Sequence, residues 1–400
     1  MYQIKKVKLF TTCVFALLIG LAFTLQNCNE YDSSTLEEIQ NSTELSSKNG
    51  KSKDKIDICH YDAAEDRWFI ISINENAWKG HQSHGDVRLD EERMAIGRAL
   101  LEVQSTNVSD VLPYYADNIE YHDPIVDIYG IEDMTAFLDQ LIIGASPDLV
   151  TTVDDETYID GVYSATWTME GSFNGIPYTA KGISIFKFVP DCSNKVYYQR
   201  DYYSEGDIMA TIPGLDQAIG GFRTYYRCAV DPIFNCPPGF PVTTATNSTL
   251  GVQNQLNNDQ LVVGRQLVEI NAQNWTNVIP YLLPEYEYYD PIVHIEGPDT
   301  MAEFLGRLFA GSSSLYTIVE DETIVDDIYM ATWTMSGMFN GAPFSAPGMS
   351  IVKFDPGTTN TYYSRDYYTE GDVMLGVPEL APAVIGFRQY YLSTVDPNYQ

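Results

Sequence analysis

The stretch TWTMEGSFNGIPYTAKG, from Thr166 to Gly182, returns as TWTMSGMFNGAPFSAPG, from Thr332 to Gly348. It begins inside a run, 162–173, in which large apolar and small polar residues alternate, as in a strand with one packed face. Asn174-Gly175 and Asn340-Gly341 follow. These pairs favour a two-residue hairpin turn, because both central positions of that turn need positive φ. Each copy therefore predicts a long antiparallel hairpin.

Two further stretches repeat at nearly the same offset. NIEYHDPIVDIYG from Asn118 returns as EYEYYDPIVHIEG from Glu285, and YYQRDYYSEGDIM from Tyr197 returns as YYSRDYYTEGDVM from Tyr362. Segments with helical periodicity precede the strands in both copies. The order of helices and then antiparallel strands is typical of an α+β domain. The 400 residues therefore predict two tandem repeats. We place them at 90–232 and 259–397, joined by a linker at 233–258.

The first residues predict an exported protein. Three lysines precede an apolar segment, 9–25, and together they are typical of a signal peptide at 1–27. The sequence before Cys28 resembles a bacterial lipobox, so Cys28 would carry lipid in an outer-membrane or cell-surface lipoprotein. Asn27 departs from that motif, which leaves open ordinary cleavage and a periplasmic or extracellular protein. Residues 28–55 predict a flexible tether.

The net charge limits the classes of binding partner, and the cysteine positions suggest one disulfide. The net charge of −32 argues against nucleic acid and anionic membrane surfaces. We therefore expect no nucleic-acid partner, and membrane attachment only through lipid on Cys28. Cys228 and Cys236 bracket a short loop and are close enough to form a disulfide. A pairing of Cys59 with Cys192 does not follow from the sequence.

A small module at 56–89 holds four candidate metal ligands, Cys59, His60, His81 and His84. Its pattern CH…W…A…H..HGD resembles a short module of exported bacterial proteins. Thiolate and imidazole are ligands of Zn²⁺ and Cu²⁺. In an oxidising compartment Cys59 could form a disulfide and would then not bind a metal. The alternative to a metal site is a small folded cap in which the histidines have a structural role. We expect no other cofactor.

Each repeat resembles the SnoaL-like, or polyketide cyclase-like, branch of the NTF2-like superfamily. The family's Asp-Pro stretch, its amphipathic helix and its long hairpin can be followed at Tyr115–Pro124, Gly130–Phe137 and Ala165–Phe188. The resemblance implies two tandem cone-shaped α+β domains, with helices packed on a curved antiparallel sheet and a pocket at the open end. Family members often dimerise through the sheet, so the repeats would form a pseudo-dimer within one chain.

The resemblance also implies a small apolar or carbonyl compound as the ligand. Isomerase-, cyclase- or hydratase-like turnover and plain binding both remain open, so the sequence does not decide whether the protein is an enzyme. The competing interpretation is a non-catalytic cell-surface binding or interaction protein whose pockets are filled by its own aromatic side chains.

The family's general base is the Asp of its Asp-Pro motif, and Asp123 and Asp290 match that position. The alternative is that each Asp only starts a turn. The positions of one oxyanion donor fall on Ser184 and Ser350, which are weak acids, so we do not expect steroid isomerase activity.

Asp201 and Asp366 lie mid-strand among tyrosines. Burial there would raise the pKa of each carboxyl and make it a second acid. Exposed ion pairs with the neighbouring arginines are the alternative. We also predict eight residues that line or border the pockets. For each of them the alternative is a purely structural role in the core, in a strand or at the rim. They are Trp167, Trp333, Ser184, Ser350, Arg200, Arg365, His122 and His294.

Overall fold

The computed structural model describes residues 55–240, 259–312, 314–339 and 341–399. The predicted signal peptide, Cys28, the tether up to residue 54 and the linker from residue 241 lie outside these residues. Within the described part of the chain, no helix combines the length and apolar character needed to cross a membrane.

The N-terminal module is a three-stranded sheet with strand order β2-β1-β3. Its elements are β1 (Lys55–Asp62), β2 (Arg67–Asn74), the 3-10 turn η3 (Glu75–Ala77), α2 (Trp78–Gln82) and β3 (Val87–Arg88). A disulfide joins Cys59 of β1 to Cys192 in the first repeat. The module is therefore covalently tied to the domain that follows it.

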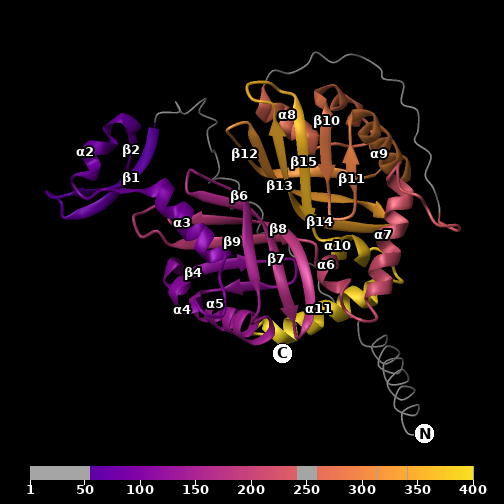
Figure 1. Ribbon diagram of the computed structural model, residues 1–400, viewed down its shortest axis with the longest axis horizontal. Helices are drawn as coiled ribbons and strands as arrows, with labels where there is room; N and C mark the ends of the chain where they lie inside the picture. The colour runs from indigo at the N-terminus through magenta and orange to yellow at the C-terminus, as the bar shows by residue number, and fades with distance from the viewer. Residues whose placement is uncertain (1–54, 241–258, 313, 340, 400) are drawn as a thin grey trace, which may run out of the picture. The chain divides into compact units, whose positions relative to one another are not determined.

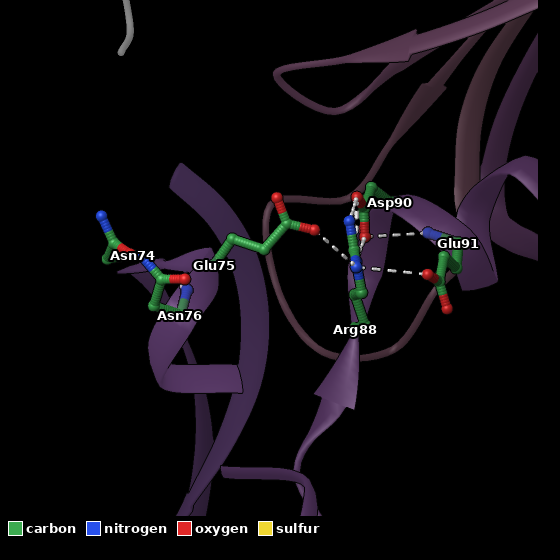
Figure 2. Close-up of polar contacts among 6 residues, drawn as sticks. All are labelled: Asn74, Glu75, Asn76, Arg88, Asp90 and Glu91. Carbon is green, nitrogen blue, oxygen red and sulfur yellow. Dashed lines mark hydrogen bonds and ion pairs between the residues drawn. The ribbon is translucent and has the colours of Figure 1, made fainter. Parts of the chain in front are cut away.

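Arg88 links the module to the first helix of repeat one (Figure 2). Its guanidinium lies 2.8 Å from Asp90 and 3.3 Å from Glu91, at the start of the helix, and 3.4 Å from Glu75 of η3. Asn74 caps η3 by accepting a hydrogen bond from the Asn76 N–H. The Arg88 side chain thus connects η3 of the module to the first helix of repeat one.

Repeat one places a six-stranded sheet against helices from the same part of the chain (Figure 1). The sheet order is β5-β4-β9-β8-β7-β6. The elements are α3 (Leu89–Leu101), α4 (Val108–Val111), η4 (Leu112–Tyr114), β4 (Tyr115–His122), β5 (Asp127–Tyr129), α5 (Ile131–Leu138), the π-helical η5 (Asp139–Ala145), β6 (Val150–Ile159), β7 (Val162–Phe173), β8 (Ile176–Phe188), β9 (Val196–Tyr203), α6 (Glu205–Met209) and α7 (Asp216–Val230).

Repeat two has the same order, β11-β10-β15-β14-β13-β12. Its elements are α8 (Gln260–Val268), η6 (Trp275–Asn277), η7 (Ile279–Tyr281), β10 (Leu282–Tyr289), β11 (His294–Glu296), α9 (Pro298–Gly311), β12 (Tyr316–Val325), β13 (Ile328–Phe339), β14 (Ala342–Phe354), β15 (Thr361–Tyr368), α10 (Glu370–Leu375) and α11 (Ala381–Val395). The α+β prediction is confirmed. Each sheet is antiparallel except for one parallel pair, β4 with β9 and β10 with β15.

The predicted hairpin has the expected turn. Asn174 and Gly175 have φ of 50° and 80°, and Phe173 faces Ile176 across the ladder. In repeat two Gly341 has φ of 82°, and Asn340 lies outside the described residues. Further along the hairpin, Trp167 faces Gly182, and its indole occupies the space that a Cβ at position 182 would need. Glycine is therefore required there for the tryptophan to lie flat across the next strand.

The prediction of a sheet with one packed face is wrong for the central strands. Ser164 and Thr166, on the face expected to be solvated, are buried. That face packs against the other repeat through one apolar cluster, made of Ile183, Ile185, Tyr202, Met330, Met349, Ile351 and Tyr367. Two ion pairs flank the cluster, Lys353 with Asp155 and Lys187 with Asp321. The polar face of the strand is buried because the sheet of the other repeat covers it. The sequence of a single strand does not reveal that second layer.

The last helix of each repeat contacts the other repeat. Helix α7 packs on α9 of repeat two, and α11 packs on η5 of repeat one (Figure 1). The rings of Phe173 in β7 and Tyr391 in α11 are stacked at 5.3 Å. The two repeats thus exchange their C-terminal helices, and each domain interior includes side chains from both halves of the chain.

Candidate functional site

A partly buried carboxylate, Asp290, lies at the end of β10 in repeat two. Asp290 Oδ1 accepts hydrogen bonds from the N–H groups of Ile292 and Val293, at 2.6 and 2.7 Å. Asp290 therefore starts the turn between β10 and β11, as the structural interpretation of the Asp-Pro motif expected. Because the turn uses only Oδ1, Oδ2 is left to face the interior of the domain.

The second carboxylate, Asp366, lies on β15 at the end of a hydrogen-bonded chain. The Trp333 indole N–H donates to the Ser350 hydroxyl at 2.7 Å, and that hydroxyl donates to Asp366 Oδ1 at 2.6 Å. The Tyr288 hydroxyl donates to Oδ2 at 2.9 Å. The predicted residues Trp333, Ser350 and Asp366 therefore meet in one network, and the indole and serine fix the carboxylate in place.

Tyrosine hydroxyls surround the free oxygen of Asp290. Tyr368 of β15 donates to Asp290 Oδ2 at 3.4 Å. Tyr226, from the exchanged helix α7, adjoins both Asp290 and Tyr368. Burial raises the pKa of both tyrosines well above its usual value, and the charge of Asp290 adds to this effect. Both hydroxyls therefore stay protonated and can donate hydrogen bonds.

Repeat one contains the same arrangement. Tyr121 bridges its two carboxylates, at 3.0 Å from Asp201 and 3.5 Å from Asp123. Tyr391 comes from the exchanged helix α11 and donates to Asp123 at 3.4 Å. The remaining partners are Ile125, Val126 and Tyr203 around Asp123, and Ser184 with Trp167 behind Asp201.

Burial shifts all four carboxyl groups toward neutrality. It raises the pKa of Asp123 and of Asp290 to about 7, against the opposing effect of the two backbone N–H groups on each. It raises the pKa of Asp366 to about 6, and it also raises the pKa of Asp201. Groups with pKa values near 7 can both take up and release a proton at physiological pH. The exposed ion-pair alternative for Asp201 and Asp366 is wrong, because serine and tyrosine hydroxyls donate hydrogen bonds to both carboxyls.

A cavity of about 180 Å³ opens above the carboxylates of repeat two. A cavity of about 150 Å³ is large enough for benzene. Most of the wall is apolar, and the polar groups that line it include Asp290, Asp366, Ser350 and Ser364. A mainly apolar wall with a few converging polar groups is the usual form of a small-molecule site.

Repeat one carries larger side chains at positions that line the cavity of repeat two. Tyr115 donates to Gln199 at 2.9 Å, and the Gln199 amide donates to Asp201 at 3.3 Å. Phe186 faces Gln199 across the ladder. The matching residues of repeat two, Leu282, Ser364 and Val352, all line its cavity. The two repeats therefore share their carboxylates but differ in the side chains packed beside them.

Four predicted pocket residues lie elsewhere. Arg200 and Arg365 precede the buried carboxylates in β9 and β15, so they point to the opposite face of the sheet. Each guanidinium lies 5.0 Å from a tyrosine ring on that face. His122 pairs with Asp127, and His294 stacks on Tyr289 at 4.1 Å. Strand alternation thus places both arginines on the face opposite the carboxylates, and the two histidines make contacts outside the carboxylate network.

Two glutamates, Glu205 and Glu370, are fully buried between the repeats. Glu370 of α10 accepts hydrogen bonds from Arg223 of α7, and Glu205 of α6 accepts them from Arg388 of α11. Asp207 and Asp372 complete the network. The signal was present in the sequence: the glutamates and the arginines both recur at an offset of 165, as do the tyrosines of the exchanged helices.

The N-terminal module brings together two of its four predicted ligands. His60 and His81 each place Nδ1 beside Asp86 Oδ2. Cys59 is disulfide-bonded and cannot supply a thiolate, and the side chain of His84 is exposed outside this group. The prediction is wrong for both. Asp86 of the same module completes the cluster.

Comparison with known proteins agrees with this architecture. The model of the SnoaL-like domain family matches the chain twice, over residues 98–192 and 263–358. The chain therefore contains two SnoaL-like domains in tandem, with the NTF2-like α+β fold that the sequence predicted. The search of curated proteins gave no match.

Several solved structures are similar to single repeats. One is a hypothetical protein with a ketosteroid isomerase-like fold from Catenulispora acidiphila, in complex with trimethylamine (14% identity, 30% of this chain and 93% of that chain, TM-score 0.27). Another is an epoxide hydrolase of the LEH-like type from M. tuberculosis (15%, 33% and 98%, TM-score 0.28). A third, from Jannaschia, is described as a SnoaL-like polyketide cyclase (19%, 32% and 97%, TM-score 0.26). These identities and scores support no inference about activity.

Proposed function

We propose that repeat two binds a single-ring, mainly apolar carbonyl compound and transfers a proton at the carbon next to its carbonyl group. The observation that carries this proposal is the cavity of about 180 Å³ with Asp290 and Asp366 at its polar end. Its volume suits one ring better than a fused ring system. Its wall offers apolar contact along most of the ligand.

In this proposal Asp290 is the general base. Its Oδ1 is held by two backbone N–H groups, so Oδ2 has a fixed direction for taking a proton from carbon. Loss of that proton moves negative charge onto the carbonyl oxygen, which then needs hydrogen-bond donors. The Tyr226 and Tyr368 hydroxyls supply donors beside the base. Asp366, when protonated, is the second acid.

We further propose that the two repeats act as an internal pair. The exchanged helices supply Tyr226 to repeat two and Tyr391 to repeat one, so each site draws on both repeats. In this pair repeat one stabilises repeat two, and its own site, filled by Gln199 and Phe186, is the less suited to a ligand. Under this proposal the non-catalytic alternative applies to repeat one alone, which would have a structural role.

We also propose that the protein works outside the cytoplasm. Support comes from the two disulfides, Cys59 with Cys192 and Cys228 with Cys236, which persist in oxidising compartments. Labelling of whole cells with a radioactive fatty acid tests lipid attachment at Cys28. Incorporation that is lost in Cys28→Ser supports a lipoprotein, and secretion without label supports ordinary cleavage.

The proposed reaction is tested with cyclohexanone in D₂O, because loss of its α-proton NMR signal reports proton abstraction directly. We expect exchange well above the buffer rate in wild type, and a loss of about 100-fold or more in Asp290→Asn, as for removal of a general base. Asp123→Asn is the matched control and should leave the rate unchanged. Saturation-transfer NMR on the same samples reports binding. Binding without exchange would establish the non-catalytic alternative, and neither signal would reject the proposed function.

A further inference from the structure

The imidazoles of His60 and His81 converge on one carboxylate oxygen in the N-terminal module. The ladder between β1 and β3 pairs Cys59 with Val87, which places His60 and Asp86 next to each other at its end. His81 lies in α2, and the chain turns back from it through Gly85, whose φ is 87°. The His60 and His81 Nδ1 atoms lie 2.8 and 2.7 Å from Asp86 Oδ2.

Burial differs within this cluster. The Asp86 side chain is 1% exposed, whereas the side chains of His60 and His81 are 27% and 25% exposed. The carboxylate thus forms the floor, and the two rings form the open side. Asp86 Oδ1 accepts a hydrogen bond from the Tyr61 N–H at 3.2 Å, which leaves Oδ2 to face the two imidazoles. A buried carboxylate needs charge compensation, which a bound cation would supply.

We propose that His60, His81 and Asp86 bind one divalent transition-metal ion, with Zn²⁺ as the first candidate. Two imidazole nitrogens and one carboxylate oxygen are a frequent three-ligand set for zinc, and water takes the fourth position. The three ligand atoms already lie within 4.8 Å of one another. The exposed side of the cluster, between the rings, gives the ion and its water a way in.

The surrounding covalent structure favours a preformed site. Cys59 adjoins His60 in β1, and its disulfide to Cys192 ties that strand to repeat one. Arg88, two residues after Asp86, is tied to α3 through Asp90 (Figure 2). The segments that carry His60 and Asp86 are thus each tied to repeat one, so an ion would not have to fold the module around itself. This site uses none of the carboxylates of the proposed function.

The test is calorimetric titration of the purified full-length protein, with disulfides intact and metal removed by a chelator, with ZnCl₂. We expect one equivalent to bind. Affinity should fall at least about tenfold in His81→Gln and in Asp86→Asn, as on loss of a metal ligand or its support. His84→Gln is the matched control, because this exposed neighbour lies outside the cluster and should leave the affinity unchanged.

Several outcomes separate the alternatives. Binding of neither ZnCl₂ nor CuSO₄ by wild type, an equal loss in His84→Gln, or full affinity in His60→Gln plus His81→Gln would each overturn the proposal. Binding of CuSO₄ alone, with the same dependence on the variants, would keep the site and assign copper to it. Circular dichroism of each variant excludes unfolding of the module. Because cyclohexanone exchange does not depend on these residues, failure here leaves the proposed function untouched.

Discussion

Both repeats contain the same four residues, two aspartates, a serine and a tryptophan, but different side chains surround them. Repeat one packs Gln199 and Phe186 beside Asp201, and repeat two has Ser364 and Val352 at those positions beside its cavity. The carboxylates, the serine behind one of them and the tryptophan behind that serine are common to both. The comparison teaches that the carboxylates are kept where larger side chains pack beside them, so their presence alone does not mark a binding site.

The contacts between the repeats are, by contrast, nearly symmetric. Arg223 of repeat one pairs with Glu370 of repeat two, and Arg388 of repeat two pairs with Glu205 of repeat one. Burial raises the pKa of Glu205 to about 7, and its arginine opposes that rise. Stability should therefore depend equally on both halves, whereas ligand binding should depend on one.

The largest expected effect tests that symmetry. Arg223→Ala leaves the fully buried Glu370 without its main partner, and such a change typically costs about 3–5 kcal/mol of unfolding free energy. Arg388→Ala should cost about as much at Glu205. Urea unfolding measures both. Arg98→Ala is the control, since its ion pair with Glu156 is half exposed and contributes less than about 1 kcal/mol. A small loss in either interface variant would show that only one helix exchange stabilises the fold.

The next effect is pH-dependent. Since the folded-state pKa of Asp290 is raised from 3.8 to about 7, its contribution to stability is full below about pH 4 and is lost as pH rises through 7. Asp290→Asn cannot ionise. The variant should therefore gain up to about 4 kcal/mol relative to wild type between pH 4 and pH 8.5.

Asp123→Asn sharpens this measurement, because burial raises the pKa of Asp123 to the same value. Urea unfolding of wild type and both variants across that pH range compares the two repeats. Equal gains would confirm equal burial. A smaller gain for Asp290→Asn would show that water in the cavity solvates its carboxylate. No pH-dependent gain in either variant would contradict the raised pKa values.

The difference in packing can be reversed by exchange of two side chains. Val352→Phe with Ser364→Gln gives repeat two the residues of repeat one beside Asp366, and these larger side chains would occupy the cavity. We expect binding of cyclohexanone to weaken about 100-fold, or about 2.7 kcal/mol, measured by saturation-transfer NMR. The reverse pair, Phe186→Val with Gln199→Ser, should open a second site. Unchanged binding in the filled variant would place the ligand elsewhere.

The fold and half of each site were predictable from sequence. Strand alternation, the Asn-Gly turn and the repeat itself depend on neighbours along the chain, and they gave the hairpin and the α+β class. Asp123 and Asp290 were found because Asp-Pro is a local pattern. Side chains alternate between the two faces of β9 and β15, which places Arg200 and Arg365 on the face opposite Asp201 and Asp366. Their assignment to the pocket therefore contradicted this alternation, which is visible in the sequence.

The rest depends on packing between segments far apart in the chain. Tyr226 and Tyr391 reach the sites because the last helices are exchanged, and no local periodicity encodes which sheet a helix will cover. The cavity also follows from three-dimensional packing, since a Ser or a Gln at a strand position fits the same alternation. Asp86 lies beside His60 only because β3 pairs with β1, and that pairing is not encoded by the local sequence.

The smallest effect we predict isolates the exchanged helix. Tyr226→Phe removes one hydroxyl beside Asp290 and leaves the ring, so the cavity wall is preserved. Loss of one hydrogen bond to a developing negative charge should slow cyclohexanone exchange about tenfold, with little change in binding. Tyr391→Phe, the same change in the other exchanged helix, should leave that rate unaltered, because its hydroxyl contacts Asp123 in repeat one. If both variants slowed exchange equally, the two sites would be coupled through the helices, and the division of roles between the repeats would be wrong.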